Sequence, residues 1–382
     1  MKNRFPHLRQ AIWAALIASI FSANAFCQNN SGEMKVNDVI VPHYAVVPPH
    51  LTVDLVSPQK AAAAGLASTV PLPTWNGSFT SGGTTYTYNM VGTAPSTNTA
   101  TTIPVFIIPL KIVIKGVLGG TTTFDPQHVL SNGKTVIQNT LDSPIFTNTT
   151  TFIQGGVNVG TTQYIDAYQR ANFWGLVQNN LNYHLLLGTP TVLPEQTINV
   201  SALNGTTGTP FGSTVGEVGI NFFDNQVRSL ITKFTQIVPN SLPIFVTYDV
   251  YLTQNTQCCI GGYHSSTGST TAPQAYAHFT YVDHPGQFAQ DVSALSHEVG
   301  EWADDPLVVN TSGNNTPCGL LENGDPLENN PNFGGFPYTS GGFTYNLQDL
   351  ATLPYFGAPP STSVNNFFTF QGESLTTCQN GS

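Results

Sequence analysis

The chain has 382 residues, enough for one large domain or two modest ones, each with its own core. Only 8% of the residues are charged, so hydroxyl and amide side chains must supply most of the polar surface. With 21 Asp and Glu against 11 Lys and Arg, the chain has too few bases to neutralise a phosphate backbone, and nucleic acid is excluded as an expected partner.

The N-terminus predicts export. Lys2, Arg4 and Arg9 form a basic region, an apolar stretch runs from Ala11 to Phe21, and Ala23-Asn24-Ala25 supplies a small-x-small cleavage pattern. The apolar stretch is too short to span a bilayer comfortably, and no second one follows. We therefore expect a signal peptide over residues 1–25, no stable membrane insertion after its cleavage, and a secreted, extracellular or periplasmic protein.

The expected export also predicts the state of the cysteines. An exported chain forms disulfides by default. Of its five cysteines, four lie in the C-terminal half, so two bridges are expected there, with three possible connectivities. The four are Cys258, Cys259, Cys318 and Cys378. A thiolate metal site is the alternative, but the adjacent pair is poorly spaced for one.

The chain order predicts an N-terminal arm over residues 26–73 and a single α+β domain over residues 74–382, with a possible β-rich subdomain at 74–160. The run Ile103–Ile114 is β-branched and apolar, and predicts a buried strand or pair of strands. Helical spacing predicts a helix over Gln163–Val177.

Further along, a second helix is predicted over Asp224–Phe234, with Asp224 as its cap. The segments Leu242–Leu252 and Ala275–Val282 predict strands. A third helix is expected to open at Asp291, and the tail Pro306–Ser382 is rich in Asn, Gly and Pro, which is typical of loops with short strands.

The third predicted helix contains the candidate metal ligands and the candidate catalytic base. At about 100° per residue, an apolar stripe forms that should pack on the core. The stripe consists of Val292, Leu295, Val299 and Trp302. His297 and Glu301 are four residues apart on the opposite side, so the two side chains can bind one ion. Glu298 then takes the position of the base that removes a proton from metal-bound water.

This pattern departs from H-E-x-x-H, because position 301 is Glu. A His and Glu set still suits Zn²⁺, the expected cofactor, while the extra carboxylate favours harder ions and makes Ca²⁺ the alternative. The alternative interpretation is that this segment is a surface helix whose acidic side chains are solvated and bind no ion. Against it, twelve acids and no base occur from Phe234 to the C-terminus, so those carboxylates must be solvated, protonated or bound to a cation.

A third ligand must come from elsewhere in the chain. The acidic loop Leu321–Glu328 offers Asp325 and Glu322. His264 and His284 are weaker candidates, since a lone histidine is more often a satisfied loop residue. Tyr263 or His264 could also hydrogen-bond a developing oxyanion.

Three short motifs carry a family resemblance: Cys259-Ile260-Gly261-Gly262-Tyr263-His264, then Ser296-His297-Glu298-Val299-Gly300-Glu301 with Asp305-Pro306, then Glu322-Asn323-Gly324-Asp325. The chain resembles the plant phosphate-induced, Exordium-type proteins and related secreted bacterial proteins over about Leu242–Glu328, and more weakly over Gln163–Trp174. The resemblance implies a zincin-like fold, a mixed sheet with an active-site-type helix behind a β-rich N-terminal half, with His297, Glu301 and Asp325 as ligands. It does not certify hydrolysis, and the segment after Glu328 departs from the plant proteins.

Three functions follow as hypotheses. The first is a secreted metallopeptidase-like hydrolase acting on a peptide or protein, with Glu298 as the catalytic base. The second is a non-catalytic extracellular metal-binding protein, associated with the cell surface or matrix, in which the ion holds the acidic loop to the helix. The third is a β-rich surface protein that binds no metal.

Overall fold

The computed structural model describes residues 34–36, 39–41, 43–45, 47–52, 70–81, 84–154, 156–255, 257–310 and 336–348. The expected signal peptide, the acidic loop with Glu322 and Asp325, and the cysteines Cys318 and Cys378 lie outside these residues. The described part mixes strands and helices, as the α+β prediction requires.

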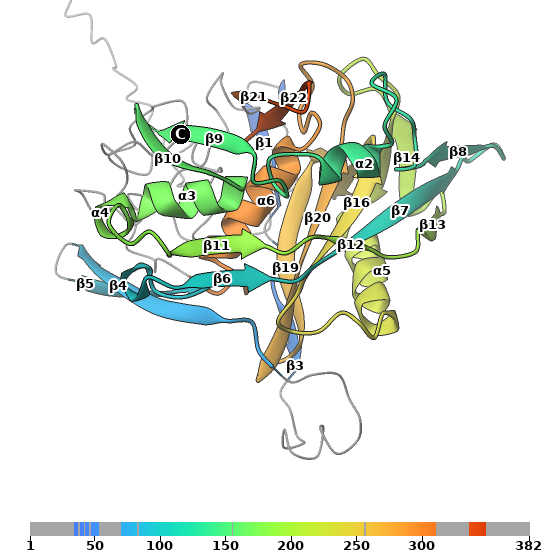
Figure 1. The fold of residues 1–382 in the computed structure, drawn as a ribbon. Helices are drawn as coiled ribbons and strands as arrows, with labels where there is room; N and C mark the ends of the chain where they lie inside the picture. The colour runs from blue at the N-terminus through green and yellow to red at the C-terminus, as the bar shows by residue number, and fades with distance from the viewer. Residues whose placement is uncertain are drawn as a thin grey trace, which may run out of the picture.

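An eight-stranded mixed sheet forms the centre of the molecule (Figure 1). Its order is β12 (Thr191–Val192), β7 (Val105–Lys115), β16 (Leu242–Tyr248), β20 (Ala272–Tyr281), β19 (Gly262–Ser269) and β3 (His50–Thr52), with β8 (Thr121–Phe124) and β13 (Gln196–Val200) also paired to β7. The neighbours β7, β16 and β20 run parallel, whereas β19 is antiparallel to β20. Because the central parallel strands are covered on both faces, β16 is apolar along nearly its whole length.

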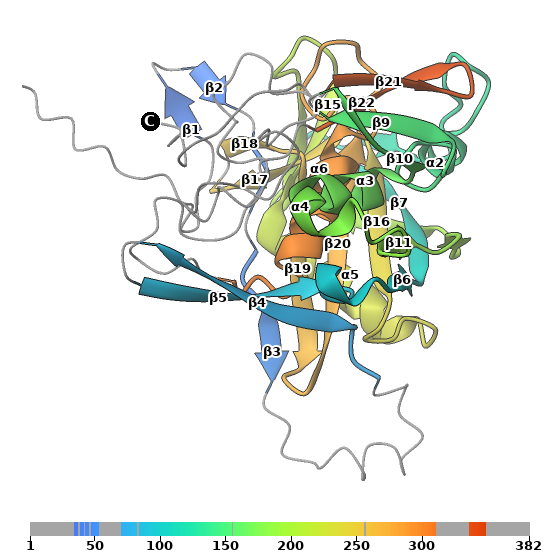
Figure 2. The ribbon, with the colours of Figure 1, turned by 60° about the vertical axis from the view of Figure 1, so that its left-hand side comes forward.

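Helices cover both faces of this sheet (Figures 1 and 2). The helices α3 (Tyr164–Asn172) and α6 (Ser293–Asp304) share one hydrophobic cluster, and α5 (Ile220–Lys233) belongs to the other. Successive residues of β16 alternate between them, since Val246 packs with the first cluster and its neighbour Phe245 with the second. The α6 helix is therefore fixed to one face of the central sheet.

Smaller elements surround this core. A four-stranded sheet contains β14 (Gly205–Gly208), β15 (Val215–Gly219), β17 (Val250–Gln254) and β18 (Gln257–Ile260). Two-stranded pairs are β1 (Met34–Val36) with β2 (Val39–Val41), β4 (Thr74–Ser81) with β5 (Thr84–Val91), β6 (Ala100–Ile103) with β11 (His184–Leu187), β9 (Thr150–Gln154) with β10 (Val157–Thr162), and β21 (Phe336–Ser340) with β22 (Phe343–Leu347). The short helices are η1 (Pro95–Thr97), α2 (Val136–Leu141) and α4 (Trp174–Val177).

Three predicted elements differ from the structure. The predicted helix Gln163–Val177 is broken at Phe173 into α3 and α4. The predicted strand Leu242–Leu252 is two strands, because Asp249 has a φ of 50° and turns the chain from the eight-stranded into the four-stranded sheet. Asp224 does not cap α5, which begins at Ile220; its buried carboxylate instead accepts hydrogen bonds from Tyr263 and Tyr276.

The segment predicted as an N-terminal arm takes part in the fold. His43 N donates to Cys259 O at 3.1 Å, and Ala45 N donates to Gly262 O at 3.1 Å. Further along, β3 pairs in parallel with β19. Residues 43–45 and 47–52 therefore lie along β18, β19 and the residue between them.

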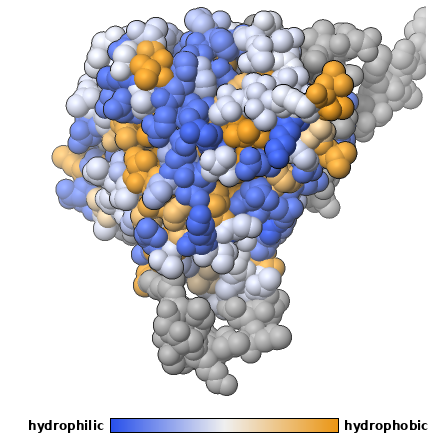
Figure 3. Space-filling view, turned by 90° about the vertical axis from the view of Figure 1, so that its right-hand side faces the viewer, coloured by the Kyte–Doolittle hydropathy of each residue, from blue (hydrophilic) through white to orange (hydrophobic). Residues whose placement is uncertain are grey.

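The exterior is polar with scattered apolar side chains. Figure 3 shows hydrophilic residues in a broad band and hydrophobic ones in small separate groups. Exposed apolar residues such as Leu118 and Leu203 lie in turns between strands. Among the described residues, no helix combines the length and hydropathy needed to cross a bilayer.

Candidate metal centre

The helix α6 is buried along its whole length. Its apolar stripe packs in the first hydrophobic cluster, as predicted, with all four residues fully buried. The polar residues of the opposite side are buried too: His297 and Glu298 are 0% exposed and Glu301 is 1% exposed. The solvated-face interpretation of these acids is therefore wrong, because burying carboxylates requires a compensating partner.

The N-terminal end of α6 is set by Asp291. Its φ of 45° turns the chain into the helix, which begins at Ser293 rather than at Asp291. The Asp291 carboxylate accepts hydrogen bonds from the backbone N–H groups of Val292 and Asn346. At the next turn, Ser296 Oγ accepts a hydrogen bond from Gln348 N at 2.7 Å. Strand β22 and the residue after it thus hold the helix that carries the candidate ligands.

Glu301 lies between two histidines. Its Oε1 is 2.8 Å from His297 Nε2, one helical turn away, and its Oε2 is 3.3 Å from His264 Nδ1 on β19. Glu298 Oε2 lies 3.7 Å from the same His264 nitrogen, which is too far for a hydrogen bond. Ligand atoms of His264, Glu298 and Glu301 all lie within 4.8 Å of one another, a spacing that one metal ion can bridge.

The protonation of His264 follows from its other nitrogen. His264 Nε2 is 2.9 Å from the backbone oxygen of Asp305, which can only accept a hydrogen bond. Nε2 therefore carries the proton, and the lone pair of a neutral His264 lies on Nδ1, facing the two carboxylates. A backbone carbonyl that fixes the tautomer in this way is a usual companion of metal-binding histidines.

Gly262 allows Glu298 to approach the strand. A Cβ at this position would lie 2.5 Å from Glu298 Oε1 and 2.9 Å from the backbone oxygen of His278. Only glycine leaves room for both contacts. The two Glu298 oxygens are buried and accept no hydrogen bond from any residue that the structure describes. This carboxylate is therefore held in place by packing, with both oxygens available to a ligand.

The close packing of acids and imidazoles shifts the pKa values of these groups. Burial raises the pKa of Glu298 well above its ordinary value. Burial would also raise the pKa of Glu301, but His297 and His264 outweigh it and lower that pKa. Burial opposes the charged form of His264, yet Glu298 and Glu301 raise its pKa to about 10. A proton on His264 balances the acids when no cation is bound, and a divalent cation would replace it.

An aromatic ring covers the centre. Tyr44, from the segment that pairs with Cys259 and Gly262, stacks on His297 with ring centroids 3.8 Å apart and an angle of 26° between the planes. Phe288 packs against Tyr44 at 4.9 Å. The centre is consequently closed to solvent in this conformation.

The predicted residues divide into three groups. The structure brings His297, Glu298 and Glu301 together and adds His264, which sequence reasoning ranked as a weaker candidate. Tyr263 lies in the other hydrophobic cluster and donates to Asp224, so it cannot assist at this centre. The expected ligand Asp325 and its alternative Glu322 lie outside the described residues.

Cys258 and Cys259 form a disulfide with each other. This bridge occurs in one of the three expected connectivities, whose other two cysteines lie outside the described residues, and it excludes both sulfurs as thiolate ligands. The bridge lies directly before Ile260 and Gly261, which lead into β19 and His264.

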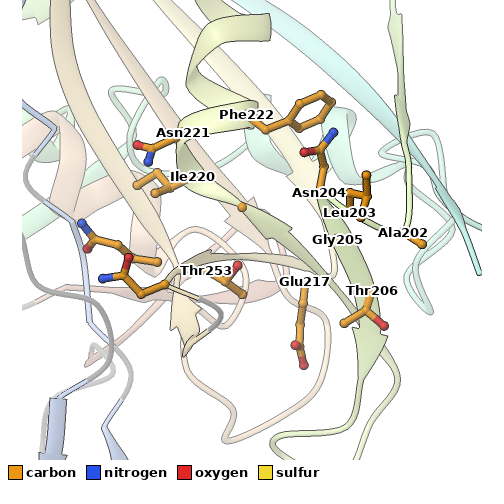
Figure 4. A pocket seen from close by; sticks show the side chains of 13 residues that line it. Ala202, Leu203, Asn204, Gly205, Thr206, Glu217, Ile220, Asn221, Phe222 and Thr253 are labelled. Atoms are coloured by element: carbon orange, nitrogen blue, oxygen red, sulfur yellow. The ribbon is translucent and has the colours of Figure 1, made fainter. Parts of the chain in front are cut away.

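Two surface cavities lie elsewhere. One of about 330 Å³ lies between β14, β15 and the start of α5, with Asn204, Thr206, Glu217 and Thr253 among its lining residues (Figure 4). Another, of about 580 Å³, lies between the β4–β5 hairpin and Asn310. Neither is lined by His264, Glu298 or Glu301. Both cavities are therefore separate from the buried centre.

Comparison with known proteins gave no match: no family model, curated protein or solved structure matches this chain. The functional argument therefore depends on the geometry of α6 and β19.

Proposed function

We propose that this chain is an exported metal-dependent hydrolase of the zincin-like kind, with a peptide or protein as its substrate. The observation that carries the proposal is the position of the buried His264 Nδ1, which faces the carboxylates of Glu298 and Glu301, with His297 beside Glu301. An imidazole nitrogen and two carboxylates that face one another in a buried space need a proton or a cation between them.

The donor set suits zinc. Imidazole nitrogen and carboxylate oxygen are usual zinc ligands, and sets of histidines with one glutamate occur at catalytic zinc sites. His297, Glu301 and His264 would hold the ion, with Asp325 as the alternative third ligand. Glu301 and His264 belong to the compact group of ligand atoms, and His297 adjoins that group through its contact with Glu301. The bound ion would polarise a substrate carbonyl and lower the pKa of a water molecule.

Glu298 is the proposed catalytic residue. It directly follows His297 on α6, and its carboxylate has no hydrogen-bond donor among the described residues. The deprotonated carboxylate is the form that accepts a proton from the attacking water and then passes it to the leaving amine, and a pKa raised by burial makes this carboxylate a stronger base. Gly262, which has no side chain, leaves the space that the Glu298 carboxylate occupies.

A second function is favoured by the burial of the centre. His264, Glu298 and Glu301 are each no more than 2% exposed, and Tyr44 covers His297. A non-catalytic protein in which the ion fastens α6 to β19 needs no opening, whereas a hydrolase requires Tyr44 and its segment to move aside. The two functions share the ion and differ in activity.

The deciding experiment uses purified protein from residue 26 onward, with elemental analysis for zinc and a labelled general protein substrate for hydrolysis. The expected result is about one zinc at this centre, hydrolysis by the parent, and loss of hydrolysis in Glu298→Gln with zinc retained. Glu217→Gln, a half-buried glutamate in the cavity of Figure 4, is the matched control and should keep both properties.

The other outcomes are equally informative. Zinc that is lost in Glu301→Gln, in a parent without hydrolysis on any protein substrate, would establish the non-catalytic function. If the parent, purified without chelator, holds no more zinc than Glu301→Gln does, both functions are overturned.

A further inference from the structure

A second cluster of ligand-type side chains lies where two parallel strands end. Strands β16 and β20 are paired in register up to Tyr248 and Tyr281, and each is followed by acidic residues. Asp249 directly follows β16, and Asp283 and His284 come after β20. Because the carboxyl ends of adjacent parallel strands lie side by side, these three side chains meet.

Their ligand atoms form a compact group. Asp249, Asp283 and His284 each offer one atom, and these atoms lie within 4.8 Å of one another. His284 Nε2 is 3.4 Å from Asp249 Oδ2, and its Nδ1 is 3.7 Å from Asp283 Oδ1. A fourth donor is close, since His128 Nε2 is 4.0 Å from Asp283 Oδ2.

The backbone holds Asp249 in position. Its N–H donates to Tyr281 O at 3.0 Å, and its own carbonyl accepts from Gly216 N at 2.8 Å. With a φ of 50°, Asp249 adopts a backbone conformation that non-glycine residues rarely take, so the surrounding contacts must hold it there. Tyr248 donates to Asp283 Oδ2 at 3.1 Å and stacks on His128, so the second carboxylate is positioned as well.

One carboxylate oxygen in this group lacks a partner. The Asp249 side chain is 7% exposed, and its Oδ1 is buried without a hydrogen bond from any described residue. All ion pairs of Asp249 and Asp283 within the described residues are with histidines, which do not carry a permanent charge. Two adjacent carboxylates without Lys or Arg, one of them buried, need a proton or a cation to balance their charge, and a cation with ligand atoms at this spacing balances both.

We infer that Asp249, Asp283 and His284 form a second divalent-cation site, separate from the centre on α6, with His128 as a further ligand. Mixed carboxylate and imidazole donors select a transition ion such as Zn²⁺ over Ca²⁺ and Mg²⁺, which take oxygen ligands. The site fastens β16 to the loop after β20, and this loop leads through Asp291 into α6. An ion here therefore stabilises the segment that presents the first centre.

The test is a calorimetric titration of the metal-depleted protein with Zn²⁺, comparing the parent with Asp249→Asn and His284→Asn. The parent is expected to bind two equivalents, and each variant should lose one equivalent or bind it roughly 100-fold more weakly. Glu301→Gln should lose the other equivalent, which separates this site from the first. Asp142→Asn removes a carboxylate that pairs with Lys134 on the surface, and should bind like the parent.

Because Asp249 has an unusual backbone conformation, its variant is also checked by circular dichroism, and His284→Asn, at a side chain 35% exposed, replaces it if it does not fold. A folded His284→Asn protein that binds both equivalents with parental affinity would overturn the inference. So would a parent that binds one equivalent, lost only in Glu301→Gln.

Discussion

His264 Nδ1 lies 3.3 Å from Glu301 Oε2, and this contact joins β19 to the third turn of α6. The same carboxylate reaches His297 with its other oxygen, 2.8 Å away. Glu301 is thus the residue through which strand and helix would share one ion. Its replacement is the most direct probe of the centre.

Glu301→Gln keeps the shape of the side chain and removes its charge. We expect zinc affinity at this centre to fall by at least about 100-fold, because a ligand is lost rather than a supporting contact. Elemental analysis and calorimetric titration check this result, with Glu217→Gln as the control. Equal zinc content in the two variants would contradict the proposed ligand role.

The third ligand can be identified by a matched pair of substitutions. If His264 holds the ion, His264→Gln should weaken zinc binding as much as His297→Gln does, while Asp325→Asn should have little effect. If Asp325 holds it, the order of the two effects reverses. The readout is the zinc dissociation constant of each variant, measured on protein whose far-ultraviolet circular dichroism matches that of the parent.

Gly262→Ala should disturb Glu298 by steric overlap. The new methyl group would lie 2.5 Å from Glu298 Oε1 and 2.9 Å from a backbone oxygen, so either the strand or the carboxylate must shift. The expected loss of unfolding free energy is roughly 1–3 kcal/mol. Gly120→Ala, where nothing lies within 4 Å of the added carbon, is the control and should change stability by less than about 1 kcal/mol. Chemical denaturation of both variants measures the difference.

His278 should make the protein sensitive to acid. Burial lowers the pKa of this histidine to about 3, from an ordinary value of 6.5. Between these two values the unfolded chain binds a proton that the folded chain does not, so stability falls as the pH drops below 6.5. The slope contributed by one such group is up to about 1.4 kcal/mol per pH unit.

His278→Phe tests this contribution, because Phe223 and Tyr263 surround the ring and an aromatic residue can fill the space. Unfolding free energies measured between pH 4 and pH 7 should change less steeply in the variant than in the parent. Parallel curves for the two proteins would show that His278 is not the source of the acid sensitivity.

Local features could be predicted from the sequence, and non-local ones could not. The pairing of His297 with Glu301 follows from helical spacing alone, as does the apolar stripe of α6. The approach of His264 depends on where β19 lies in the sheet, and its only local signal was the preceding Gly261-Gly262 pair. Likewise, Asp224 resembles a cap in sequence, but its position among Tyr263 and Tyr276 is a property of the packed core.

The disagreement at Asp249 has a similar origin. An apolar run from Leu242 to Leu252 indicates one strand, and a single acidic residue within it carries little weight in such a pattern. The structure uses that residue to pass from one sheet to another, and so places its carboxylate beside Asp283.

The docking of residues 43–45 and 47 has a consequence for the order of assembly. Tyr44 covers His297 from a segment whose partners come far later in the chain; Val47, for instance, accepts a hydrogen bond from Ser265, 218 residues away. A chain grows from its N-terminus, so this early segment has nothing to pair with until most of the protein has been made. This early segment is thus among the last to reach its place, and a nascent chain cannot display the finished centre.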